Sequence, residues 1–286
     1  MKMKITREQE KIVNLTLKFS TKLYDNGERE IEKLVKKYNT DKEKLLNEIA
    51  MILLKYKVIN SIMDLKRVER IKLYKTLVHQ IDEFTQMNEK TEKEVLTALL
   101  LNTAYHKFNT NNYVFILGSK LSLKNITDKE IKKILDAKID GKLYSDRIYK
   151  NKNEVSAKLK KDIDNLLKGK TSINDIEKSI SKRFGTLEED TKRLIENEVS
   201  RVQSQVNELW MQKNNIKYVI YSSALDRRVC GYCSQYEGQV FFINERPVEL
   251  PQHVRCRCIY IPITNTWEYP SEITNITWDS YLNSVK

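Results

Sequence analysis

Residues 195–210, I-E-N-E-V-S-R-V-Q-S-Q-V-N-E-L-W, decide the fold class of this chain. Their apolar side chains recur at steps of four, three, four and three, at Ile195, Val199, Val202, Val206 and Leu209. This spacing places them along one face of an α-helix, with charged and amide side chains opposite. We therefore expect a long amphipathic helix that packs against neighbouring helices.

The same periodicity covers much of the preceding chain, starting with a stripe at Ile5, Ile12, Leu15, Phe19 and Leu23. A break is expected at Y-D-N-G, residues 24–27. Only 7 Gly and 4 Pro occur in 286 residues, which favours long helices because the turns of sheets need both. The first hundred residues are expected to form a bundle of antiparallel helices, with a coiled coil as the alternative.

Two regions depart from this helical pattern. Residues 108–125 contain a β-prone run with a Gly, and we expect a hinge or a small strand there. After Lys217, three short β-branched or aromatic runs (218–224, 239–243 and 258–263) predict a small sheet. The expected fold is therefore mainly α: a helical N-terminal region at 1–110, a helical middle region within a domain at 125–262, a β-rich metal-binding module at 218–262, and a tail at 263–286.

Lys and Arg outnumber Asp and Glu by 51 to 39, giving a formal net charge of +12. This excess favours an anionic partner such as double-stranded DNA, although it also aids solubility. Lys158, Lys160 and Lys161 lie in a basic stretch and are candidate DNA contacts; a solvated helix face would look the same. No segment approaches the roughly 18 apolar residues of a membrane span, and the N-terminus lacks the apolar stretch of a signal peptide. We expect a protein without a membrane partner that is made in the cytoplasm.

All four cysteines of the chain lie between residues 230 and 258, in C-G-Y-C followed after nineteen residues by H-V-R-C-R-C. In a reducing cytoplasm such a cluster indicates metal ligands before disulfides. A CxxC turn and a HxxC turn supply two pairs of ligands, as the tetrahedral preference of zinc requires. The candidate ligands are Cys230, Cys233, His253, Cys256 and Cys258.

Five candidates for four positions predict a closed, structural zinc site, because catalytic zinc keeps a position open for water. Which candidate stays outside the coordination sphere is open, since Cys256 and Cys258 would share one face of a strand. Buried free thiols, a redox CxxC and a catalytic Cys/His pair are the alternatives, and each lacks its usual sequence context. Asp226, Arg227 and Arg257 flank the cysteines and either orient the ligand loops or are ordinary surface charge.

The segment D-R-R-V-C-G-Y-C-x4-G, followed by P-x-H-x2-C-R-C, resembles the C-terminal signature of the phage head morphogenesis family, the minor head proteins similar to the F protein of phage Mu. Upstream, D-G-K-L-Y-S-D-R-I at 140–148 and G-K-T-S at 169–172 are similar to further segments of that family. Val229 stands where many members have Thr. The resemblance covers residues from about 138 to 262, and the cysteine segment is its specific part.

This resemblance implies a structural protein of the virion, in the head interior near the portal, with roles in head assembly and in DNA packaging or ejection. The implied partners are the portal protein, a major capsid or scaffold protein, and packaged DNA. The alternative is a metal-dependent nuclease or another hydrolase acting on nucleic acid, which would need carboxylates or histidines beside an open metal position. His79 and His106 lie far upstream in helical patterns, so we expect no enzyme and no catalytic residue. A zinc-finger transcription factor is excluded by spacing, because no helix separates the cysteine and histidine pairs.

Overall fold

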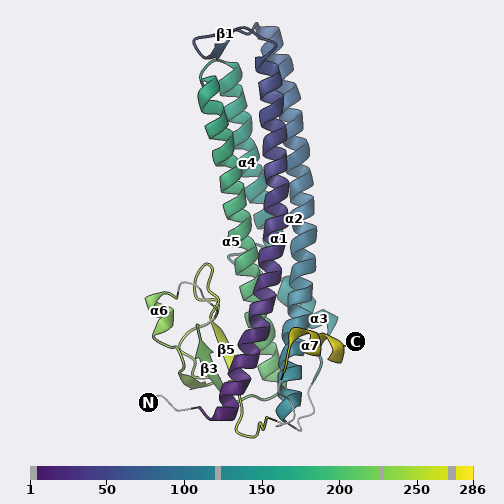
Figure 1. Cartoon of the computed structure of the whole chain (residues 1–286), viewed down its shortest axis with the longest axis vertical. Coiled ribbons are helices and arrows are strands. Elements are labelled where there is room, and N and C mark those ends of the chain that lie inside the picture. The colour runs from purple at the N-terminus through teal and green to yellow at the C-terminus, as the bar shows by residue number, and fades with distance from the viewer. Residues whose placement is uncertain (1–4, 120–123, 224, 226–228, 270–274, 286) are drawn as a thin grey trace. The chain divides into compact units, whose positions relative to one another are not determined.

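The computed structural model describes residues 5–119, 124–223, 225, 229–269 and 275–285. These residues form seven helices and two small antiparallel sheets, which confirms the predicted mainly α fold (Figure 1). The helices are α1 (Arg7–Leu53), α2 (Arg67–Gly118), α3 (Asp128–Leu135), α4 (Tyr144–Leu167), α5 (Ile173–Lys213), α6 (Gly231–Ser234) and α7 (Trp278–Ser284). The strands are β1 (Val58–Ile59), β2 (Ile62–Met63), β3 (Tyr218–Ser222), β4 (Val240–Phe242) and β5 (Ile259–Ile263). No described helix is long and apolar enough to cross a membrane.

The chain packs into two compact units, each assembled from separated stretches. Unit 1 comprises Met1–Glu28, Thr97–Ala137 and Ile195–Lys286, whereas unit 2 comprises Arg29–Leu96 and Lys138–Leu194. Helices α1, α2 and α5 each contribute to both units. The predicted domains at 1–110, 125–262 and 263–286 lie where the hydrophobic patterning of the sequence changes. These boundaries stay a prediction.

The expected break at residues 24–27 does not occur, because α1 continues through it. Gly27 takes a helical place within unit 1 against α5, where a Cβ atom would lie 3.5 Å from the Cγ2 of Val199. This is an ordinary van der Waals distance, so Gly27 packs on α5 as any residue of the helix would. The Asp-Asn-Gly signal for a turn is overridden by tertiary packing.

The expected hinge or strand at residues 108–125 is also wrong for its first half, since α2 continues to Gly118. Phe115 is fully buried and its ring lies 4.7 Å from that of Trp210 on α5. The indole Nε1 of Trp210 donates a 2.7 Å hydrogen bond to Asn112. These contacts hold β-prone residues in a helix, because β propensity reflects the packing surface more than the backbone.

A three-stranded antiparallel sheet of order β4-β3-β5 completes unit 1. All five residues of β5 are buried, and the carbonyl of Tyr260 accepts a 2.6 Å hydrogen bond from Asn207 of α5. The same Asn207 side chain also contacts α2, because its Oδ1 accepts a 2.9 Å hydrogen bond from Asn111. The sheet thus lies on the amphipathic helix that the sequence predicted, where Ile195, Val199, Val202 and Val206 are all buried.

The C-terminal residues dock on the same unit. Trp267 donates a hydrogen bond to the carbonyl of Val114, and a Cβ atom on Gly118 would collide with the Trp267 ring at 2.2 Å. Tyr281 of α7 is fully buried and its hydroxyl lies 2.7 Å from the Nδ1 of His106. The described part of the tail is therefore packed into unit 1.

Unit 2 is a bundle of four helical segments joined at one end by the β1–β2 hairpin. Its core contains a buried polar network with one residue from each segment: Tyr38, Glu92, Lys152 and Thr191. The Lys152 ammonium pairs with the Glu92 carboxylate, and it also donates to the Tyr38 hydroxyl at 2.8 Å and to Thr191 at 3.2 Å. Buried charges persist only when they are paired and hydrogen-bonded in this way.

Candidate metal centre

The short helix α6 positions the first pair of cysteines. Cys230 is its N-cap, and the Cys230 sulfur accepts a 3.3 Å hydrogen bond from the backbone N–H of Cys233. This bond fills the place that Ser, Thr or Asp commonly takes at a helix start. Cys233, one turn later, is completely buried. The CxxC segment therefore presents one partly exposed and one buried sulfur to the same side.

A tight turn before β5 positions the second group of candidates. The backbone N–H of Cys256 donates to the carbonyl of His253 at 3.1 Å, and Arg255 between them takes a positive φ of 64°. Asn197 of α5 accepts a 2.6 Å hydrogen bond from the backbone N–H of Arg255, and Ser200 donates to the carbonyl of Cys256 at 2.5 Å. Helix α5 thereby holds this turn in place. Cys256 and Cys258 are both buried.

The five candidates meet in two groups that share Cys233. One group is Cys230, Cys233 and His253, the other is Cys233, Cys256 and Cys258, and within each the ligand atoms lie within 4.8 Å of one another. The His253 Nε2 lies 3.4 Å from each of the sulfurs of Cys230 and Cys233. A tetrahedral zinc with bonds of roughly 2.3 Å to sulfur and 2.0 Å to nitrogen separates such atoms by about 3.5 Å. The cluster could hold a metal ion, and the histidine is already at ligand distance.

Hydrogen bonds prepare these side chains for a cation. The Nδ1 of His253 lies 2.9 Å from the carbonyl of Val254, and this hydrogen bond raises the pKa of His253 and turns Nε2 towards the sulfurs. The backbone N–H of Cys233 lowers the pKa of Cys230, whereas burial raises the pKa of Cys233 to about 11. A hydrogen bond with Cys258 lowers the pKa of Cys256 to about 5. A bound cation would complete the deprotonation of the buried thiols.

Tyr221 of β3 carries a polar atom that the protein leaves unsatisfied. Its hydroxyl is buried and has no hydrogen-bond partner within hydrogen-bonding geometry among the described residues. Burial raises the pKa of Tyr221 strongly, and the nearby sulfurs of Cys258 and Cys233 raise it further. A hydroxyl facing two sulfurs becomes a donor once those sulfurs are thiolates. A buried hydroxyl without a partner fits a site where a cation holds the neighbouring cysteines as thiolates. The sequence does not predict a role for Tyr221, because the alternation of side chains along β3 does not show which face meets the cysteines.

The residues expected to support the ligand loops divide into two cases. Arg257 lies between Cys256 and Cys258 and pairs with Glu28 at 3.0 Å and with Glu196 at 3.5 Å. Its guanidinium also covers the ring of Tyr24 at 4.9 Å, so it ties the cysteine turn to α1 and α5. Asp226 and Arg227 lie outside the described residues. An orienting role for these three residues stays a prediction.

The three lysines proposed for DNA differ in their surroundings. Lys158 and Lys161 are exposed on α4, whereas Lys160 forms a 2.5 Å ion pair with Asp82 of α2. The Asp82 carboxylate offsets the positive charge of Lys160 and would compete with a phosphate for its ammonium group. Of these three lysines, Lys158 and Lys161 are the two that are exposed to solvent.

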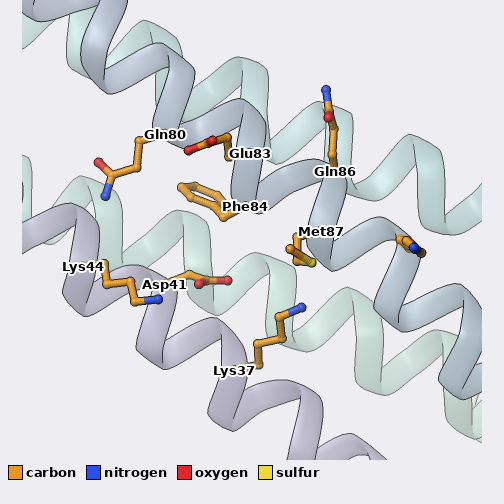
Figure 2. Close-up of a pocket in the computed structure, with 9 residues that line it drawn as sticks. Lys37, Asp41, Lys44, Gln80, Glu83, Phe84, Gln86 and Met87 are labelled. Atoms are coloured by element: carbon orange, nitrogen blue, oxygen red, sulfur yellow. The ribbon is translucent and has the colours of Figure 1, made fainter.

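Unit 2 also has a groove between α1 and α2, which Figure 2 shows with its lining side chains. Phe84 and Met87 form its apolar part, and Lys37, Lys44 and Lys90 stand around it. Asp41 accepts a 2.8 Å hydrogen bond from Asn88, and Lys37 donates to Thr91 at 2.7 Å. No cysteine or histidine lines this groove among the described residues. The groove therefore lacks the thiolate and imidazole ligands that a second zinc site of this kind would need.

Comparison with known families bears on residues 157–261, which match a family model described as Phage Mu protein F like protein. The match runs from α4 to the third residue of β5 and includes all five candidate ligands. It confirms the resemblance to the phage head morphogenesis family over these residues. No curated protein and no solved structure matches the chain.

Proposed function

We propose that this chain is a minor head protein of a bacteriophage, which acts in head morphogenesis as a structural component of the virion. The observation that carries the proposal is the family match at residues 157–261. The matched segment ends in the module that holds the Cys/His cluster, so the family resemblance and the unusual chemistry coincide.

The proposed metal is zinc, held by Cys230, Cys233, His253 and Cys256. Thiolates and imidazole are the ligands that zinc prefers in closed structural sites. Cys256 is proposed as the fourth ligand because it closes the H-x-x-C turn with His253 and its sulfur lies within 4.8 Å of the Cys233 sulfur, as that of Cys258 also does. Cys258 then lies next to the site with Tyr221, where its thiol supports the bound sulfurs. Four protein ligands leave no position for an activated water, which supports a structural role.

Zinc is proposed to fasten the α6 turn to the turn before β5, which α5 already holds through Asn197 and Ser200. The sheet is small, with strands of five, three and five residues, and β4 is only partly buried. Ligands from both the α6 turn and the β5 turn would be joined by one ion, and metal binding would supply folding free energy. In the particle, this unit would present a fixed surface to the portal and to a capsid or scaffold protein.

Contact with packaged DNA is proposed for Lys158 and Lys161, in support of packaging or ejection. The net charge of +12 and the exposure of both side chains support it. Binding should be independent of sequence and should weaken with salt. The double change Lys158→Gln/Lys161→Gln should flatten the salt dependence of DNA affinity by about two units if each lysine contacts one phosphate. Lys178→Gln/Lys182→Gln on α5 is the matched control, since both lysines are exposed.

The function is tested by interrupting the gene in the phage or prophage that encodes the chain. Particles that lack the protein should be malformed or poorly filled with DNA, and the wild-type gene supplied in trans should restore them. Mass spectrometry of purified virions should detect the chain at low copy. Normal, infectious particles without the protein would contradict a role in the head.

The same purified protein tests the nuclease alternative. Zinc-loaded protein, supplied separately with Mg²⁺ or Mn²⁺, should leave linear and supercoiled DNA intact. Metal-dependent cleavage that disappears in His253→Ala would replace the structural proposal with a hydrolytic one.

A further inference from the structure

The hairpin between the end of α1 and the start of α2 lies at one end of unit 2 (Figure 1), and exposed apolar side chains are concentrated in this stretch. Of the 17 large hydrophobic side chains that the described residues expose, seven fall within 21 consecutive residues. We name these the apolar tip; they are Met51, Leu54, Val58, Ile59, Ile62, Val68 and Ile71. Leu54 and Val68 are 80% and 78% exposed. Scattered exposed hydrophobics are normal, whereas a concentration of this kind marks an interaction site.

The tip is held in place rather than left loose. The hairpin turns at Asn60 and Ser61, whose φ values of 49° and 62° are those of a two-residue type I′ turn. The Ser61 carbonyl accepts a 3.0 Å hydrogen bond from the backbone N–H of Ile173, and Met63 is buried. Gly169 lies so close to Ile62 that an added Cβ would stand 2.7 Å from its Cγ2. Val58, Ile59 and Ile62 are therefore exposed on an anchored hairpin.

Positive charge surrounds the apolar tip. Six exposed cations lie between residues 55 and 75, and none forms an ion pair within the described part of the chain: Lys55, Lys57, Lys66, Arg67, Lys72 and Lys75. The same stretch contains only two acidic residues, Asp64 and Glu69, and Glu69 accepts the backbone N–H of Lys66 at 2.8 Å. A partner that covers the apolar side chains must therefore supply negative charge at its edge.

We propose that the apolar tip docks on another structural protein of the same particle, at an apolar surface bordered by acidic residues. The inference rests on the proposed function for the source of the partner, and on the tip for its chemistry. The buried apolar side chains would set the lifetime of the complex, and the surrounding lysines and arginines would set its rate of formation.

The charge pattern disfavours self-association, and the composition of the apolar tip disfavours a membrane and a nucleic acid. A second copy of this chain would bring six cations against six cations around the same apolar centre. Interfacial membrane segments anchor mainly through Trp, Tyr, Phe and Leu, and of these the apolar tip contains Leu54 alone. A nucleic acid would contact the lysines through its phosphates, but the seven apolar side chains would stay exposed to water or would have to insert between bases.

The test measures binding of the full-length protein to the purified portal, major capsid and scaffolding proteins of the same phage, one at a time. Leu54→Ser/Val58→Thr and, separately, Val68→Ser should weaken binding to one of them by about tenfold or more through faster dissociation. Lys55→Gln/Lys57→Gln should slow association instead, and added salt should do the same to the wild type. Leu101→Ser/Ile116→Ser, at exposed apolar positions of α2 in unit 1, is the control that should bind normally.

Other results separate the two proposals. A head protein that binds all variants equally would overturn docking by the apolar tip and leave the proposed function standing. Wild-type protein that binds none of the three would count against both. Flotation with phosphatidylserine vesicles, or a concentration-dependent dimer that Leu54→Ser/Val58→Thr abolishes, would assign the apolar tip to a membrane or to self-association and overturn the proposal. Unchanged melting of each variant shows that it folds.

Discussion

The hydroxyl of Ser200, on α5, donates a 2.5 Å hydrogen bond to the backbone carbonyl of Cys256. This bond is buried and links the amphipathic helix directly to the turn that carries two candidate ligands. The turn that carries Cys256 is therefore fixed to the helical core of unit 1 by a buried hydrogen bond. The geometry of the metal centre therefore depends on a side chain 56 residues away in the sequence.

Ser200→Ala should weaken zinc binding by about tenfold, because residues that fix ligand orientation contribute on this scale. It should also lower the free energy of unfolding by about 1 kcal/mol through the unsatisfied carbonyl. Competition with a chromophoric chelator measures the first effect and denaturant unfolding the second. Thr186→Ala, at an exposed position of the same helix, is the control. Equal zinc affinity in the two variants would remove Ser200 from the metal centre.

Tyr221→Phe should affect the metal-free and the zinc-bound protein in opposite directions. Its hydroxyl makes no hydrogen bond within the described residues, so removing it should raise the unfolding free energy of the metal-free protein by about 1 kcal/mol. Zinc affinity should fall, because a hydroxyl beside Cys233 and Cys258 would donate to thiolates once metal is bound. Calorimetric titration of both proteins measures the difference. A variant that binds zinc as tightly as the wild type would show that the hydroxyl points elsewhere.

Removal of zinc, by chelation or by Cys233→Ser, should release β3, β4 and β5 while unit 2 stays folded. The sheet is small and its strands are joined through the ligand loops, whereas unit 2 has its own buried core. Hydrogen exchange should therefore lose protection at Tyr218–Ser222 and Ile259–Ile263 but not at Tyr144–Leu167. Loss of protection throughout α4 would mean that the metal supports the whole chain.

The prediction of these features from sequence succeeded where the signal is local. The 3.6-residue periodicity of residues 195–209 needs only neighbouring residues and predicts the observed helix, and the cysteine spacing predicts a cluster that the structure brings together. Val114 and Phe115 have β propensity, and their helical state depends on Trp210 nearly a hundred positions away. The pairing of Lys160 with Asp82 and the position of Tyr221 against the sulfurs are also long-range contacts. No pattern along one segment contains that information.

Lys107→Met should stabilise the protein below pH 7. Lys107 is fully buried against Ser20 at 3.0 Å, and burial lowers its pKa from 10.5 to about 7. Between these two values the unfolded chain binds a proton that the folded protein does not, so wild-type stability rises with pH across that window. The advantage of the variant should be several kcal/mol at pH 6, at about 1.4 kcal/mol per pKa unit, and should shrink towards pH 10. Denaturant unfolding at several pH values measures it; a difference independent of pH would contradict the lowered pKa.

Lys152→Met should destabilise the protein by about 3–5 kcal/mol, because it leaves the buried Glu92 carboxylate without its cation. The double change Lys152→Met/Glu92→Leu should recover most of this loss, since a buried ion pair is often no more stabilising than apolar residues of similar volume. Denaturant unfolding of both variants gives the comparison. Additive losses in the double variant would show that the two residues do not act as a pair.

The central claim is that one zinc ion joins the α6 turn to the β5 turn in a closed site. Native mass spectrometry of protein purified without chelator tests it most directly, because the mass counts bound ions and reports disulfides together. We expect the mass of the chain plus one zinc in the wild type, and the mass of the chain alone in Cys233→Ser and in His253→Ala. A metal-free mass with undiminished thermal stability, or a Cys230–Cys233 disulfide in reducing buffer, would contradict it.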